Sequence, residues 1–236
     1  MSSTPVSPDD SSASTPADRR RRRRALLAGG LVLGLGAAVT LAAWSDDVVA
    51  GGLFNSGTFE LQGATDGTTF HDYDAEAKDN GPTQANLAFS VNATSMSPGQ
   101  TVYAPLTIAT STASTLNGTF TLSKVAANGD YAGVLSYRIA SGAATHGANC
   151  SADGFGNLSA WTGGPTAKVN AGVVGPNGPL AVAAKQATPQ QHLCIAVTMG
   201  NPDATQSDNQ KAVEGVTRSG NDTSVTWTFT GTSTDA

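Results

Sequence analysis

Hydrophobic and polar positions alternate along most of the chain beyond residue 44. Apolar side chains recur at every second position in seven short runs, near residues 58–62, 87–91, 102–108, 120–122, 135–139, 193–197 and 225–229. Because successive side chains of a strand point to opposite faces, each run predicts a strand with one buried face. In the last run Val225, Trp227 and Phe229 alternate with Ser and Thr only.

Turn residues separate these runs. Gly, Pro and Asn cluster at residues 97–99, 117–118, 128–130 and 175–179. Short strands that are separated by such turns favour a two-sheet antiparallel sandwich over an α/β fold. No long stretch carries apolar residues at helical spacing. We therefore predict an all-β domain over residues 44–236. Its Gly-, Ala- and Asn-rich part, residues 142–191, is expected to hold one or two short strands within large loops.

The first 43 residues follow a different pattern. Residues 1–18 are mostly Ser, Thr, Pro and Asp, six arginines occupy 19–24, and 25–43 are Ala, Leu, Gly or Val apart from Thr40. A basic region before an apolar run is typical of an export signal, with the arginines on the cytoplasmic side. We expect residues 1–24 to be disordered and residues 25–43 to form the signal helix. An uncleaved anchor and a twin-arginine route are alternatives.

Removal of the signal leaves an acidic protein. The whole chain has 13 basic and 18 acidic residues; without the six arginines, Asp9, Asp10 and Asp18, 7 basic and 15 acidic residues remain, a net charge of −8. This balance offers no electrostatic footprint for nucleic acid or an anionic membrane. We expect a secreted protein of the cell surface or extracellular matrix, which meets the membrane only through an uncleaved signal.

The chain has two cysteines, Cys150 and Cys194. An even pair in an exported chain predicts one disulfide. Two unpaired thiols and a two-ligand metal site are the alternatives.

The junction between the apolar run and the exported domain carries the most specific motif. Small residues end the run, an aromatic-polar-Asp triplet follows, and a spacer leads to a Gly-Thr-aromatic strand: Ala42-Ala43-Trp44-Ser45-Asp46, then Gly52-Leu53-Phe54-Asn55-Ser56-Gly57-Thr58-Phe59-Glu60-Leu61. This stretch resembles the TasA/camelysin family and proteins with a SipW-type signal peptide. Two further stretches resemble later family segments: residues 94–108, with Gln100 at the usual acidic position, and Val213-Glu214-Gly215 with the closing strand 224–230.

The resemblance implies a jelly-roll-like sandwich that a dedicated signal peptidase releases by cleavage between Ala43 and Trp44. It also implies self-association, since some relatives form biofilm-matrix fibres in which each subunit donates its N-terminal strand to the next. A free apolar segment that adds to an open sheet edge is physically sound. The donor-strand candidates are Trp44, Val48, Val49, Leu53 and Phe54. Alternatively, the segment is the first strand of its own subunit.

Candidate chemistry is sparse. Camelysin-like relatives have been classed as metallopeptidases, but the chain has no His-Glu-x-x-His motif, and His71, His146 and His192 are far apart in sequence. We expect no enzymatic activity and no cofactor. If calcium binds, the densest acidic cluster offers the ligands, although a solvated loop is the alternative interpretation: His71, Asp72, Asp74, Glu76 and Asp79.

The sequence therefore favours a secreted structural protein that forms fibres by strand donation. The main alternative is an exported monomeric binding module for a wall polysaccharide or a host surface. Such a module would present an open aromatic platform in the loops around Phe155 and Trp161. A metallopeptidase is the third hypothesis.

Overall fold

The computed structural model describes residues 17, 19–24, 26–27, 56–73, 82–90 and 93–234. The chain divides into two compact units, Met1–Phe54 and Asn55–Ala236. In the first unit the described residues are helical and include the six arginines, for which the sequence predicted no order. No helix within the described ranges has the length and apolar character needed to cross a membrane. Most of the predicted signal segment, residues 25–43, lies outside those ranges.

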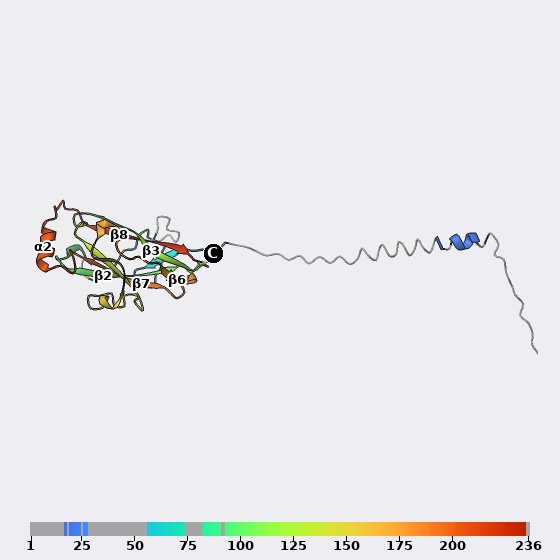
Figure 1. Cartoon of the computed structure of the whole chain (residues 1–236), viewed down its shortest axis with the longest axis horizontal. Coiled ribbons are helices and arrows are strands. Elements are labelled where there is room, and N and C mark those ends of the chain that lie inside the picture. The colour runs from blue at the N-terminus through green and yellow to red at the C-terminus, as the bar shows by residue number, and fades with distance from the viewer. Residues whose placement is uncertain are drawn as a thin grey trace, which may run out of the picture. The chain divides into compact units, whose positions relative to one another are not determined.

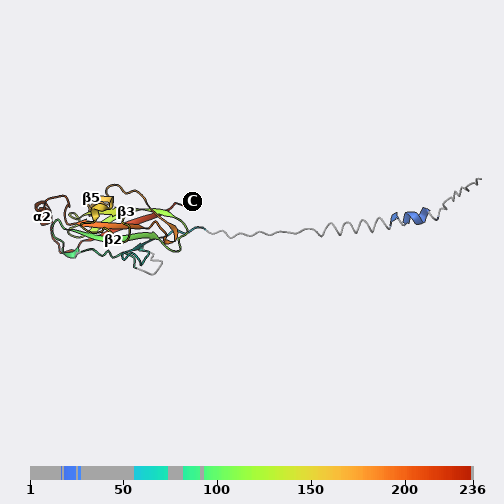
Figure 2. The same ribbon diagram turned by 90° about the horizontal axis from the view of Figure 1, so that it is seen from below.

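The second unit is a sandwich of two antiparallel sheets (Figures 1 and 2). The larger sheet has the order β1-β2-β7-β4-β5, and the smaller sheet has the order β6-β3-β8. The strands are β1 (Leu61–Ala64), β2 (Thr101–Thr110), β3 (Gly118–Asn128), β4 (Ser136–Ser141), β5 (Ser159–Lys168), β6 (Leu180–Val182), β7 (Gln191–Thr198) and β8 (Ser224–Ser233). The all-β sandwich is thus confirmed, whereas the jelly-roll connections stay a prediction.

The predicted period of two builds the core between the sheets. Residues at alternate positions of β2, β3, β4 and β7 point inward and are almost fully buried: Val102, Leu106, Ile108, Phe120, Leu122, Tyr137, Ile139, Leu193, Ile195 and Val197. Each large apolar side chain buried in this way contributes about 1.5–3 kcal/mol. Trp161 of β5 joins them and stacks on Phe229 of β8, with ring centroids 6.2 Å apart.

Helix α2 (Gln206–Glu214) lies at one end of the sandwich, opposite the C-terminus (Figure 1). Its N-cap Thr205 accepts a hydrogen bond from the Asp208 backbone N–H and donates one to the Asp208 carboxylate. This capping arrangement holds together a helix whose sequence is almost wholly polar. Val213 and Glu214, part of the stretch that resembles the family's closing segment, belong to this helix, and the predicted closing strand lies within β8.

Four single turns of 3₁₀ helix complete the described elements: η1 (Ala93–Ser95), η2 (Phe155–Asn157), η3 (Val169–Ala171) and η4 (Ala184–Gln186). The run near residues 87–91 forms no strand within the described residues, although the Ser90 N–H donates to the Tyr103 carbonyl of β2 and the Ser90 hydroxyl accepts from the Tyr103 N–H. Residues 142–191 contain β5 and β6, and β5 has ten residues rather than the short strand expected.

Candidate functional site: an open groove beside strand β8

Strand β8 forms an edge of the smaller sheet. It pairs with β3 from Gly118↔Ser233 to Asn128↔Ser224, and no other described strand pairs with it. Its ten residues contain neither a charged side chain nor proline. Natural edge strands usually carry such residues because they prevent pairing with another chain. The free edge of β8 is therefore a suitable template for one more strand.

The sandwich is open beside β8. A groove of about 730 Å³ separates residues 225–231 of β8 from residues 59–63 and 83–87. Its floor is formed by core residues of the larger sheet, Leu106, Ile108 and Ile195. Glu60 and Asp72 are the charged residues that line it, so the groove contains no basic group among the described residues. The apolar floor favours an occupant that presents apolar side chains to it.

The apolar side chains that line the groove are only half-buried. This set comprises Phe59, Leu61, Leu87, Phe89, Val225, Trp227 and Phe229. Phe120 and Leu122, which pack in the middle of the sandwich, are each 1% exposed. Among the described residues, the core is therefore covered at its centre and uncovered along this flank. Covering the flank would gain about 25 cal/mol for each Å² of apolar surface removed from water.

Trp227 carries an unsatisfied donor in the groove. Its indole Nε1 is buried and has no hydrogen-bond partner, an arrangement that typically costs about 1–3 kcal/mol. The indole of Trp161 differs, because its Nε1 donates to the Gly178 carbonyl at 2.7 Å.

The described part of the second unit begins at Ser56, next to Phe59 of the groove wall. The Thr58 backbone N–H donates to the Thr115 hydroxyl, and the Thr58 carbonyl accepts from the Thr115 N–H, both at 2.9 Å. The Thr234 N–H donates to the Asn117 carbonyl. The cleavage residues Ala43 and Trp44 and the other donor-strand candidates, Val48, Val49, Leu53 and Phe54, lie outside the described residues. In sequence they directly precede this point.

The acidic cluster is only partly described. The backbones of His71 and Gly63 form a bridge, and Asp72 lies in the groove wall at 4% exposure rather than in a solvated loop. Asp74, Glu76 and Asp79 lie outside the described residues, so the calcium hypothesis stays a prediction. Within the described ranges no three His, Cys, Asp or Glu side chains gather as they would around a metal ion.

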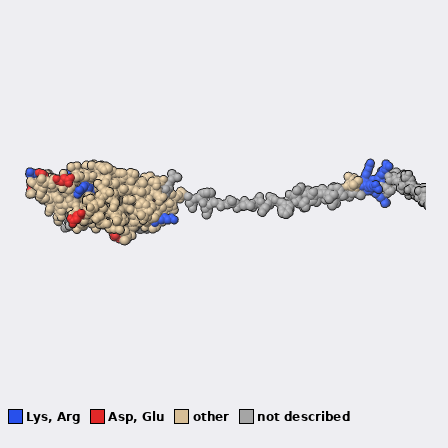
Figure 3. Space-filling model, turned by 60° about the horizontal axis from the view of Figure 1, so that its bottom comes forward, with Lys and Arg blue, Asp and Glu red and all other residues tan. Residues whose placement is uncertain are grey.

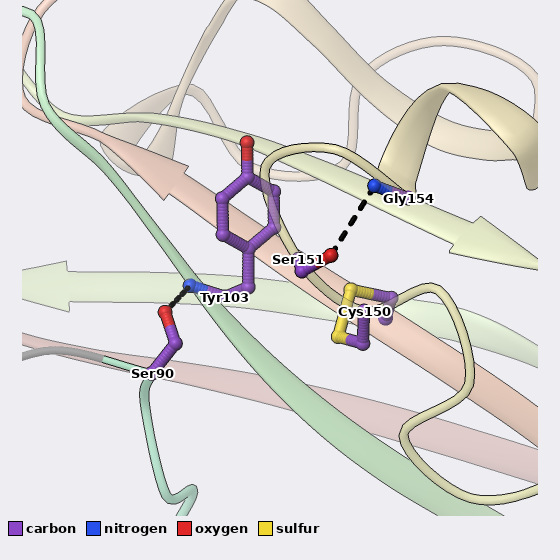
Figure 4. The surroundings of a disulfide bond; sticks show 6 residues. Ser90, Tyr103, Cys150, Ser151 and Gly154 are labelled. Carbon is purple, nitrogen blue, oxygen red and sulfur yellow. Dashed lines mark hydrogen bonds between the residues drawn. A yellow bond between two sulfur atoms is a disulfide. The ribbon is translucent and has the colours of Figure 1, made fainter.

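The disulfide between Cys150 and Cys194 is confirmed (Figure 4). It fastens the loop after β4 to the outer face of the larger sheet, where Cys194 packs with Tyr103 and Ala196. Beside it, the Ser90 hydroxyl accepts from the Tyr103 backbone N–H at 3.2 Å. A disulfide of this kind indicates an oxidising compartment.

The structure does not form the aromatic platform that a binding module would present. Trp161 is 5% exposed and belongs to the core. Phe155 packs against the Tyr103 ring at 5.6 Å, and the Arg138 guanidinium lies 5.0 Å from its ring centroid. Trp161 is therefore buried in the core, and Phe155 is partly buried between these two side chains.

Two histidines that are far apart in sequence meet in the fold. The Nδ1 atoms of His146 and His192 each lie 2.9 Å from the Thr107 hydroxyl oxygen. Burial lowers the pKa of His192, and the charge of His146 lowers it further. Sequence reasoning missed this cluster because only the register of β2 and β7 places Thr107 opposite His192.

The visible face of the second unit carries only scattered charged side chains (Figure 3). Comparison with protein-family models found no match, and comparison with curated proteins found none either. The resemblance to the TasA/camelysin family therefore rests on the quoted residues of the signal junction, the 94–108 stretch and the closing strand.

Proposed function

We propose that this chain is a secreted, non-enzymatic structural protein of the cell surface or extracellular matrix. After signal cleavage, copies polymerise because the N-terminal segment of one copy, residues 44–54, adds to strand β8 of the next. The observation that carries this proposal is the unpaired, uncharged edge of β8 beside a groove with half-buried apolar walls. A jelly-roll-like topology, completed by the added strand, is part of the proposal.

Addition of one strand would cover both the free edge of β8 and the half-buried apolar walls of the groove. The backbone of the added strand would pair with β8, while its alternate side chains would cover the apolar walls. In an added strand, Trp44, Val48 and Phe54 of the donor segment would fall on one face, and Val49 and Leu53 on the other. Because donor and acceptor surfaces differ, the contacts are head-to-tail, and head-to-tail contacts that do not close into a ring give a filament.

The competing arrangement places the same segment in the groove of its own subunit, which would give a monomer. A monomeric binding module has no specific support, since Trp161 is in the core and Phe155 is partly buried between Tyr103 and Arg138. The two arrangements of the N-terminal segment differ in oligomeric state and not in the contacts within the groove. Assembly is therefore the property to measure.

The test is electron microscopy and sedimentation of the purified secreted chain, beginning at Trp44. We expect filaments, and we expect a chain that lacks residues 44–50 to stay monomeric. The shortened chain retains the acceptor groove but has no donor, so adding it to the intact chain should cap the polymers and shorten them. Monomers under all conditions, with behaviour unchanged by the deletion, would overturn the proposal.

A further inference from the structure

We propose that His146 and His192 form a binding site for a divalent transition-metal ion of the zinc class. The observation is the convergence of two imidazole Nδ1 atoms on one buried hydroxyl oxygen, that of Thr107, at 2.9 Å each. The site lies on the outer face of the larger sheet. It is independent of the groove and of the proposed polymerisation.

Three segments hold the two rings in place. Thr107 and His192 face each other across the β2–β7 pair, so two neighbouring strands fix their relative position. His146 lies four residues before Cys150, and Cys150 is bonded to Cys194, which shares a strand face with His192. The disulfide therefore anchors the loop of His146 beside His192. Ligands mounted on rigid elements are what a metal site requires.

The turn after β1 supports the His146 ring from the other side. Gly67 has φ +77°, and a Cβ on it would lie 2.5 Å from Cβ and Cγ of His146. The neighbouring carboxylate of Asp66 is engaged by the backbone N–H groups of Thr68 and Thr69 and by the Thr69 hydroxyl. Asp66 is therefore committed to its own turn, and the available ligands are two imidazoles and one hydroxyl.

A metal ion can enter between the His146 and His192 rings because only hydrogen bonds to Thr107 join them. A hydroxyl has one proton to donate, so when both rings are neutral one Nδ1 accepts from Thr107 and the other donates to it. An ion that binds between the rings replaces this proton-bridged contact, and no ion pair has to be broken. His146 and His192 are only half-buried, so the ion has a path from solvent, and water can fill its remaining positions.

The donor atoms select the metal. Imidazole nitrogen suits zinc, copper and nickel, whereas calcium and magnesium require several oxygen ligands. A histidine ligand must be neutral, and the half-buried position of His192 disfavours its charged form. A bound metal ion would link the 142–150 loop to strands β2 and β7 and so form a second cross-link beside the disulfide.

The test is calorimetric titration of the untagged, chelator-treated secreted chain with zinc chloride, together with its thermal unfolding midpoint. We expect one saturable zinc site, a raised midpoint with zinc, and no change with magnesium chloride. Because loss of an outer-shell partner alone typically weakens metal binding 10–100-fold, His192→Asn should raise the zinc dissociation constant at least about tenfold. His71→Asn is the matched control and should bind zinc as the unchanged chain does.

A readout on the unaltered protein guards against variants that fold poorly. Zinc should shift the nitrogen resonances of two imidazoles, those of His146 and His192, and leave that of His71 in place. Zinc binding that survives both His146→Asn and His192→Asn would overturn the proposal. So would the lack of any resonance shift at a large excess of zinc.

Discussion

The ring of Phe59 lies directly over Gly118, at the point where the N-terminal segment meets the sandwich. A Cβ on Gly118 would contact Phe59 Cε2 and would lie 2.6 Å from both Phe59 Cζ and the Thr232 carbonyl oxygen. Glycine is required here because ring and backbone approach so closely.

Gly118→Ala is expected to destabilise the domain by about 1–3 kcal/mol, the usual cost of overpacking, because neither Phe59 nor the β8 backbone can withdraw freely. Urea unfolding followed by circular dichroism would measure the loss. Gly164→Ala is the control, since no atom lies within 4 Å of a Cβ at that position. Equal stabilities of the two variants would contradict the close contact.

Thr228→Lys is expected to suppress assembly without unfolding the domain. Thr228 is an exposed residue near the middle of the β8 edge, and a lysine there would oppose pairing with an added strand. Asn128→Lys adds the same charge at an exposed position of β3, opposite Ser224 within the existing β3–β8 pair and away from the free edge of β8. Sedimentation should show fewer polymers for the first variant and unchanged polymers for the second.

The two tryptophans of the sandwich should respond differently to replacement by phenylalanine. Trp161→Phe leaves the Gly178 carbonyl without its donor and opens space in the core, at a cost of about 1–3 kcal/mol. Trp227→Phe removes a donor that has no partner, so the loss should be smaller, within about 1 kcal/mol. Urea unfolding of both variants tests the difference; a larger loss for Trp227→Phe would refute it.

Stability should fall when the pH drops below about 6.5. The pKa of His192 in the folded state is lowered from its ordinary value of 6.5, so in this range the unfolded chain binds more protons than the folded one. The contribution of His192 is complete above pH 6.5 and is lost as the pH falls through the lowered pKa. Hydrogen bonds from Thr69 and Thr68 also lower the pKa of Asp66, but from 3.8, so its loss occurs at more acidic pH.

Thermal unfolding between pH 8 and pH 5, in the presence of chelator, would measure the His192 contribution. His192→Asn should flatten the dependence in that window. An unchanged slope in this variant would show that His192 does not carry the effect.

Loss of the disulfide should cost about 4 kcal/mol on the loop-entropy model, for a bridge that spans 44 residues. Cys150→Ser with Cys194→Ala would test this by urea unfolding. The same variant should make the outer loop around Phe155 sensitive to proteases, because that loop packs on the sheet beside the bridge. Resistance equal to that of the parent would show that the packing of Phe155 alone holds the loop.

Alternation of apolar and polar residues was sufficient to predict most strands and the inward face of each. This worked for β2, β3, β4, β7 and β8 because side-chain direction in a strand is a local property with a period of two. Helix α2 was missed because its stability comes from the Thr205 cap and from burial of Asn209 and Val213, and not from an apolar repeat. The disulfide was predictable because the chain has only two cysteines.

The sequence by itself determined the strand pattern, the cysteine pair and the signal junction, since each is written in adjacent residues or in composition. Only the tertiary structure decided that, among the described residues, β8 is an edge, that an uncovered apolar flank opens beside it, and that Trp227 keeps an unsatisfied donor there. It also decided that His146 and His192 meet on Thr107. These features depend on which strands pair and in what register, and such pairing joins residues that are distant in sequence.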